Sequence, residues 1–301
     1  MKVGVSISST HSNDDHRAGA RWMIERARVA RDAGLDSLSL GDHHSMPVPY
    51  FQGVPMLGRL MAEWSTDRPI GALFLLPLWN PVLVAEQVGT LATLCEGPFI
   101  VQTGIGDGAG QFSAMNASLS TRGADLDESI RVIKGLLAGE EISSPRFGIE
   151  GAVVSPRPPE PVEWWIGAGG PGPILRAARS GDAWYAGPWA TPSQMLDMTA
   201  IYREASAAEG KPGRICMRKD VIVLRDADRA RHIGTDLIER GYRGLGNESV
   251  AYGGVDEVVE QLAPFREIGV DEVIVRCMTI DQADALETLE LCGEVRQALH
   301  P

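Results

Sequence analysis

The chain has 301 residues, 44% of them hydrophobic, and a net charge of -12. Its mean hydropathy of -0.07 is that of an ordinary soluble globular protein with ample length for a large core. The acidic balance disfavours a nucleic acid or an anionic membrane surface as a partner. The four cysteines are scattered and form no C-x-x-C pair, which argues against a zinc ribbon or a disulfide framework and suits a reducing cytosol.

The first eight residues have no apolar signal-peptide region and are typical of a β-strand. No apolar run approaches the length of about 18 residues that indicates a membrane span. We therefore expect a cytoplasmic protein that acts on a small molecule, with neither a nucleic acid nor a membrane as its partner.

Strands and helices are expected to alternate along the whole chain. Apolar and β-branched runs predict strands at 3–8, 36–41, 68–76, 98–103, 164–167, 182–186, 215–224 and 270–278. Helical spacing predicts helices at 17–33, 56–64, 82–94, 121–138, from 172 onward, 192–209, 227–240, 255–268 and 282–299. The Pro- and Gly-rich segment 45–58 is expected to be a loop, and 143–161 an irregular stretch.

Eight β/α repeats whose strands are too apolar to have a wet face imply a closed parallel sheet. We predict one domain over residues 1–301, an α/β protein with the TIM (β/α)8 barrel fold and loop insertions. A doubly wound open sheet stays as the alternative, because the number of strands alone does not prove closure. No linker or low-complexity segment divides the chain.

The first candidate site is the glycine-rich turn at 167–172, between a predicted strand and a predicted helix. Bare backbone at Ala168, Gly169 and Gly170 can approach a phosphate closely, and a helix N-terminus directs N–H groups toward an anion. A phosphate or a phosphorylated cofactor is one interpretation, and a tight turn without a ligand is the other. Aromatic side chains near 164–165 and 184–189 could line an apolar pocket beside this turn.

The sharpest cluster of ionisable residues is Asp42-His43-His44, at the end of the second predicted strand. A carboxylate beside an imidazole can set its tautomer or raise its pKa, which makes a general acid or base near neutral pH. A metal site with His11 and His16 is a weaker interpretation, because paired histidines on a strand point to opposite faces. A histidine packed beneath a loop is the third.

Asp107 lies in a glycine-rich loop, 104–110, after the fourth predicted strand. The surrounding glycines would let a flat ring or a backbone-bound ligand lie close to this carboxylate. A phosphate cradle is the competing use, but no lysine follows as in a Walker A motif. A solvated loop carboxylate is the simplest alternative.

With these residues placed, the chain resembles the bacterial luciferase-like superfamily, and within it the coenzyme F420-dependent oxidoreductases. The similar segments run almost from end to end of the chain. They are 33–43 (AGLDSLSLGDH), 76–81 (LPLWNP) with 85–91, 99–107 (FIVQTGIGD), 166–171 (IGAGGP) and 253–275.

The resemblance implies a TIM barrel whose carboxyl-terminal mouth holds a flavin or deazaflavin ring. His43 matches the histidine that takes the substrate proton in F420-dependent sugar-phosphate enzymes, and Asp107 stands where those enzymes have a glutamate as partner acid. Asp42 falls at a position that contacts the ring. Leu73 and Phe74 correspond to a bulged non-prolyl cis peptide that backs the ring.

The same resemblance implies that the backbone of Ala168, Gly169 and Gly170 binds the cofactor phosphate. Gly187, after the sixth strand, falls at another cofactor-binding position, where those enzymes have a threonine. Arg176 and Arg179 are candidates to bind the cofactor tail.

This chain departs from the sugar-phosphate enzymes at two further places. Pro47 stands where they have a tryptophan, and the segment between the seventh and eighth strands, where a sugar-phosphate pocket finds its cations, is shorter here. These departures argue against glucose 6-phosphate as the substrate.

We therefore expect an F420-dependent oxidoreductase that transfers a hydride between the deazaflavin and a small organic substrate, with His43 and Asp107 as acid/base partners. One alternative is an FMN-dependent monooxygenase on the same barrel, supplied by a separate reductase. Another is a non-catalytic flavin-binding protein. By analogy with the family, the protein is expected to be a homodimer, and no metal is expected.

Overall fold

The computed structural model describes residues 1–300, and its core is a set of parallel strands that neighbour one another almost in chain order. The barrel strands are β1 (Lys2–Ile7), β2 (Leu38–Leu40), β3 (Ile70–Leu75), β4 (Phe99–Gly104), β7 (Glu163–Ala168), β8 (Ala183–Ala186), β9 (Arg214–Val223) and β11 (Glu272–Cys277). Because β9 pairs with both β8 and β11, the sheet closes on itself. The predicted barrel is confirmed, and the open doubly wound sheet is excluded.

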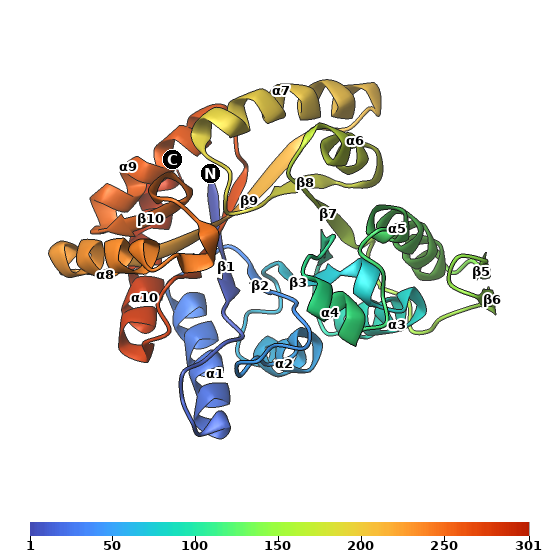
Figure 1. Ribbon diagram of the computed structural model, residues 1–301, viewed down its shortest axis with the longest axis horizontal. Coiled ribbons are helices and arrows are strands. Elements are labelled where there is room, and N and C mark those ends of the chain that lie inside the picture. The colour runs from blue at the N-terminus through green and yellow to red at the C-terminus, as the bar shows by residue number, and fades with distance from the viewer. Residues whose placement is uncertain (301) are drawn as a thin grey trace.

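Helices surround the strands (Figure 1). They are α1 (His16–Asp32), α2 (Gly53–Met61), α3 (Pro81–Ala92), α5 (Arg122–Ala138), α6 (Pro171–Ser180), α7 (Pro192–Ala208), α8 (Ala227–Glu239), α9 (Val255–Ile268) and α10 (Gln282–Leu299). Asp15 caps α1 and Asn80 caps α3 through bonds of 2.9 Å from backbone N–H groups, and Thr191 forms a capping box with Gln194 at α7. Such caps fix where a helix begins.

Several short elements lie in segments that the sequence left irregular. They are η1 (Leu76–Leu78), α4 (Ala109–Ala114), the antiparallel hairpin of β5 (Ile142–Ser144) and β6 (Ile149–Ala152), η2 (Tyr242–Gly244), η3 (Asn247–Ser249) and β10 (Val250–Gly253), which pairs with β9. In addition, α2 begins inside the segment expected to be a loop. Elements this short carry too little periodicity to be recognised in a sequence. Within residues 1–300, no helix has the length and apolarity needed to cross a bilayer.

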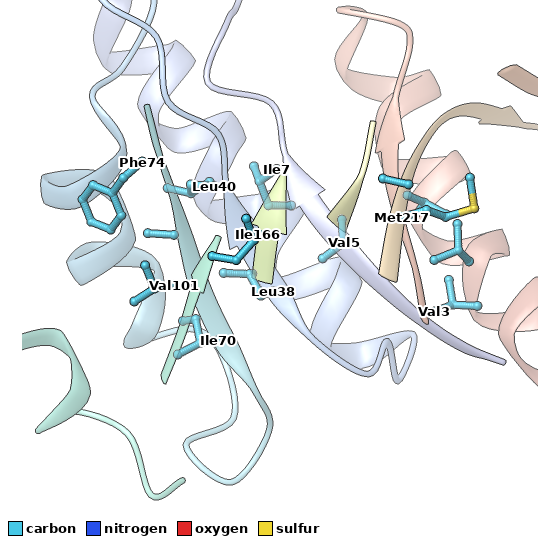
Figure 2. Packing of buried hydrophobic residues seen from close by; sticks show 14 of the residues in the cluster. Val3, Val5, Ile7, Leu38, Leu40, Ile70, Phe74, Val101, Ile166 and Met217 are labelled. Atoms are coloured by element: carbon cyan, nitrogen blue, oxygen red, sulfur yellow. The ribbon is translucent and has the colours of Figure 1, made fainter. Parts of the chain in front are cut away.

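The larger apolar layer lies between the strands and the helices. Val3, Val5 and Ile7 of β1 belong to it, together with Leu38 and Leu40 of β2 (Figure 2). Since side chains alternate along a strand, the intervening residues of β1 face the barrel interior.

A second buried cluster fills the barrel itself. It consists of Ile100, Trp165, Ala183, Cys216 and Ile274, with Tyr185 packed against it. Trp165 is fully buried, and its ring centroid lies 5.8 Å from that of Tyr185. Because this cluster fills the interior, the barrel is a core rather than a pore, and a ligand has room only at its rim.

The expected cis peptide at Leu73–Phe74 is not present, and that prediction is wrong. Within residues 1–300 the only cis peptide bond is Ser155–Pro156. Leu73 and Phe74 instead lie in the regular pairing of β3 with β4, which needs no bulge. The Phe74 side chain is 1% exposed and belongs to the buried apolar layer (Figure 2), and the contact of Leu73 and Phe74 with a cofactor ring stays a prediction.

A buried lysine joins two loops at the rim. Lys219 of β9 is 1% exposed, and its Nζ donates to the carbonyl oxygens of Pro188 at 3.3 Å, Ala190 at 2.6 Å and Ser249 at 3.2 Å. The first two precede α7 and the third precedes β10, so one ammonium group fixes both loops. Burial lowers the pKa of Lys219 to about 8, while the neighbouring Asp220 opposes the shift.

From the lowered pKa of Lys219 we predict how the stability of the protein depends on pH. Between about pH 8 and the ordinary lysine pKa of 10.5, the unfolded chain retains a proton that the folded chain has lost. The free energy of unfolding therefore rises with pH in this range, by up to about 1.4 kcal/mol per pH unit, and this group contributes no slope below it. Urea unfolding from pH 7 to 10.5 should show the rise in the wild type and not in Lys219→Met.

Lys211→Met is the matched control for this measurement. Lys211 Nζ also donates to three carbonyl oxygens, those of Ala178, Arg179 and Gly181, but the residue is only half-buried. This variant should keep the rise. An equal rise in Lys219→Met would show that another group titrates.

Candidate active site

Apart from Leu73 and Phe74, which lie within β3, the predicted site residues lie at or just after the carboxyl ends of barrel strands, which closure of the parallel sheet places around one rim. Asp42 and His43 follow β2, Asp107 follows β4, Gly169 and Gly170 follow Ala168 at the end of β7, and Gly187 follows β8. The structure thus brings together residues separated by up to 145 positions of sequence, from Asp42 to Gly187.

The Asp42 carboxylate connects the ends of β2 and β3. Its Oδ2 accepts the Leu75 N–H at 2.8 Å and the Trp79 indole N–H at 2.7 Å, while Oδ1 lies 3.3 Å from His44 Nε2. The residue is buried, so these donors hold it in one orientation. Asp42 therefore positions Trp79 at the rim, and its contact with a cofactor ring stays a prediction.

The two histidines that follow Asp42 have different environments. His44 is buried, and its ring meets the edge of Trp79 at a centroid distance of 5.1 Å. His43 is only half-buried, and its ring lies 6.1 Å from that of Tyr50. The interpretation of a histidine packed beneath a loop thus describes His44, whereas His43 has access to the rim.

Burial lowers the pKa of His43 below its ordinary value, and the charges of Asp107 and Asp42 oppose this shift. The imidazole is therefore mostly neutral at pH 7 and able to accept a proton. Asp107 raises the pKa of His43, so the loop after β4 interacts electrostatically with the loop after β2 although β3 lies between these strands.

The metal interpretation finds no suitable arrangement of ligands. Among residues 1–300, no group of three or more His, Cys, Asp or Glu side chains is placed to hold a metal ion. The His11 ring stacks on Phe51 with centroids 5.0 Å apart, and its other neighbour is His16 at 5.3 Å.

The Asp107 loop is shaped by two glycines in the left-handed region. Gly106 has φ of 69° and Gly108 has φ of 79°, conformations that a larger residue adopts only under strain. Between these glycines the Asp107 side chain is exposed. The backbone carbonyl oxygen of Asp107 accepts the Gln111 Nε2–H at 3.0 Å. The two glycines thus shape a loop on which the Asp107 carboxylate is accessible.

Gln111 of α4 was missed in the sequence. Its side-chain oxygen accepts the His44 backbone N–H at 2.8 Å, while its amide donates to Asp107, so a single side chain joins both loops that carry the proposed acid/base pair. It is buried, with 7% of its surface exposed. A lone glutamine in a six-residue helix gives no sequence signal, because neither partner lies within a recognisable motif.

The glycine turn after β7 offers an anion fewer backbone N–H groups than a usual helix N-terminus does. Pro171 and Pro173 occupy the first turn of α6 and have no N–H to offer. The N–H groups that remain are those of Gly169, Gly170 and Gly172, which donate to no acceptor among the described residues. A Cβ at Gly170 or Gly172 would meet open space, so a ligand can approach there.

Trp189 packs on the two remaining glycines of this region. A Cβ built on Gly187 would lie within 2.1 Å of the Trp189 ring, and one on Gly169 within 3.0 Å. The indole is nevertheless 53% exposed. Gly187 is thus required by the packing of Trp189 even in the absence of a ligand, and its cofactor role stays a prediction.

The two arginines suggested for the cofactor tail differ in availability. Arg176 Nε lies 2.5 Å from Asp127 Oδ1 on α5, whereas Arg179 is exposed. Their role stays a prediction. The segment between β9 and β11, expected to be shorter than in the sugar-phosphate enzymes, contributes Arg243 to the rim. The positive charge of Arg243 lowers the pKa of His43.

With the geometry in place, comparison with known proteins identifies the family. Residues 1–248 match the family described as luciferase-like monooxygenase, and the chain belongs to this family. An F420-dependent glucose-6-phosphate dehydrogenase of Kineococcus radiotolerans is 30% identical over 172 residues, which cover 54% of this chain and 51% of that protein. The match thus spans about half the length of this relative.

More distant similarities extend over most or all of the chain. An enzyme of the same description from Nakamurella multipartita is 25% identical over 280 residues, 88% of this chain and 81% of that protein. A solved F420-dependent secondary alcohol dehydrogenase in complex with an F420–acetone adduct has a TM-score of 0.82 at 17% identity, covering 100% and 99% of the two chains. A monooxygenase from Streptomyces bottropensis reaches 0.84 at 19% identity, covering 98% of each chain. These two structures share the fold.

We predict that removing the two hydrogen bonds of the Gln111 side chain lowers the stability of the protein and the pKa of His43. Gln111→Leu leaves the His44 N–H and the Asp107 carbonyl without their partner, so the free energy of unfolding should fall by about 1–3 kcal/mol. If the Asp107 loop then moves away, the pKa of His43 should fall as well, which NMR titration measures.

Gln52→Leu is the control, since Gln52 Nε2 also bonds the same loop, at the His43 carbonyl oxygen 3.2 Å away, but is exposed. It should change stability by less than about 0.5 kcal/mol. Equal effects of the two substitutions would contradict the positioning role of Gln111.

Proposed function

We propose that this protein is an F420-dependent oxidoreductase that transfers a hydride between the deazaflavin and a small organic substrate. The observation that carries the proposal is His43: a half-buried, mostly neutral imidazole at the barrel rim, under the influence of the Asp107 carboxylate. The relatives described as F420-dependent glucose-6-phosphate dehydrogenases support this choice of cofactor.

The residues present fit such a cofactor. The free N–H groups of Gly169, Gly170 and Gly172 suit its phosphate, and Leu73, half-buried near the end of β3, would lie against its ring. When bound, the deazaflavin would supply a two-electron hydride acceptor or donor. FMN would satisfy the same contacts.

In the oxidative direction, His43 would accept the proton that leaves a substrate hydroxyl. The resulting imidazolium is stabilised by Asp107, whose charge already raises the His43 pKa against the effect of burial. Asp42 and Gln111 hold the segment that carries this histidine and the carboxylate loop in their relative positions. In the reductive direction, the same imidazolium would return the proton.

A second candidate is an FMN-dependent monooxygenase. The description of the family and the fold shared with the Streptomyces bottropensis monooxygenase favour it. The non-catalytic alternative is disfavoured, because a protein that only binds a flavin has no need of the His43–Asp107 pair.

The proposed role of His43 predicts separate effects on turnover and on binding. His43→Ala should lower kcat by about 10²- to 10⁴-fold, the usual contribution of a general base, and change the Kd for F420 by less than about threefold. Steady-state kinetics and fluorescence titration measure the two quantities. His232→Ala, at an exposed position of α8, should change neither. Retained turnover in His43→Ala would contradict the acid/base role.

We predict that removing the charge of Asp107 shifts the pH profile of kcat/KM. Its charge raises the pKa of His43, so Asp107→Asn should lower that pKa further and move the acid limb of kcat/KM to lower pH. Asp256→Asn, an exposed carboxylate of α9, should leave the limb in place. An acid limb that stays unchanged in Asp107→Asn, or moves upward, would exclude Asp107 as the partner of His43.

A further inference from the structure

Three arginines surround one buried carboxylate on the side of the rim formed by β9 and β11. Asp220 is fully buried, and its Oδ1 lies 3.1 Å from Arg218 Nε. Its Oδ2 lies 3.4 Å from Arg276 Nη1 and 3.8 Å from Arg243 Nε, and accepts the Tyr242 hydroxyl at 3.0 Å. No part of the mechanism above uses this cluster.

The cluster depends on an unusual turn. Arg243 has φ of 51°, and the flanking Gly241 and Gly244 have φ of 80° and 69°. A left-handed conformation at a residue other than glycine costs about 1–3 kcal/mol and persists where the surroundings impose it. Here the turn delivers both Tyr242 and Arg243 to Asp220. Backbone strain of this kind indicates that the position of Arg243 has a use beyond closing a loop.

The charges in the cluster do not balance. Three guanidinium groups face a single carboxylate, although the side chains of Arg218 and Arg276 are only 16% and 15% exposed. Burial and the charges of the other two arginines lower the pKa of Arg243 to about 10. Uncompensated buried charge is costly, and an anion bound here would offset that cost. Guanidinium groups are well suited to a carboxylate or a phosphate, which they can bind through two parallel hydrogen bonds.

A chain of contacts connects this cluster to His43. Arg276 Nη2 donates to Ser8 Oγ at 3.1 Å, and this hydroxyl bonds Thr10 at 3.0 Å. Thr10 forms a β-bridge with Tyr50, the residue that neighbours the His43 ring. The arginine cluster and the proposed proton acceptor therefore belong to the same rim, joined through the loop after β1.

We infer that Arg218, Arg243 and Arg276 bind an oxyanion group of the substrate, a carboxylate or a phosphate, with Asp220 holding the guanidinium groups in position. Calling this ligand the substrate rests on the proposed function. The substrate is then a small organic acid or phosphate ester whose oxidisable carbon faces His43. An oxyanion of the cofactor has the same chemistry, and the experiment separates the two sources.

The test is calorimetric titration with inorganic phosphate and, separately, with succinate. The wild type should bind one of them, and Arg243→Gln should bind it at least about tenfold more weakly. Arg240→Gln is the matched control, because Arg240, at the end of α8, forms an ion pair with Asp236 and has a side chain that is 76% exposed. It should bind like the wild type. Equal binding by the wild type and Arg243→Gln, or no binding of either probe, would overturn the inference.

Arg243→Lys keeps a cation in the same turn and guards against a folding defect in Arg243→Gln. Its affinity should lie between those of the wild type and Arg243→Gln, and affinity as low as in Arg243→Gln would contradict the charge argument. Thermal unfolding verifies that each variant is folded.

Repeating the titration with F420 at saturation separates substrate from cofactor. Undiminished anion binding supports a substrate subsite, whereas its loss would assign the cluster to the cofactor and overturn the inference. Should F420 fail to bind while anion binding still depends on Arg243, the proposed function fails and the oxyanion site stands.

Discussion

The pairing of β8 with β9 is the constraint on which the rest of the structure depends. It closes the parallel sheet, and closure brings the ends of strands that are far apart in sequence to one rim. The buried cluster around Trp165 fills the space beneath. Chemistry is therefore confined to the carboxyl-terminal rim of the barrel, and the function of the protein depends on how rigidly the loops of this rim are held.

The loops are held by buried polar groups, each of which joins two of them. Asp42 ties the end of β2 to the end of β3, Gln111 ties the His44 segment to the Asp107 loop, and Lys219 ties the loop before α7 to the one before β10. A buried donor or acceptor left unpaired costs more than the bond contributes, so each link enforces one geometry. At this rim the pKa of His43 is raised by the negative charge of Asp107 and lowered by the positive charge of Arg243.

The sequence was sufficient to predict the barrel strands, because buried parallel strands are apolar throughout and the helices between them show their own periodicity. It also placed His43, Asp107 and the glycine turn on the same rim. It could not show Gln111 or Arg243, which act through contacts between segments that no local pattern connects. The predicted cis peptide at Leu73–Phe74 failed because it followed a resemblance, whereas the register of β3 with β4 is regular in this chain. Gly187 has a structural explanation that only the position of Trp189 reveals.

The central claim is that the rim binds a deazaflavin rather than FMN. The most direct measurement is a titration of the purified protein with F420 and, separately, with FMN, followed by quenching of tryptophan fluorescence. Trp189, against Gly169 and Gly187, and Trp79, against Asp42, are well placed to report on the rim. The account predicts tighter binding of F420 than of FMN. Tighter binding of FMN would move the protein to the monooxygenases, and binding of neither would contradict the role given to the glycine turn.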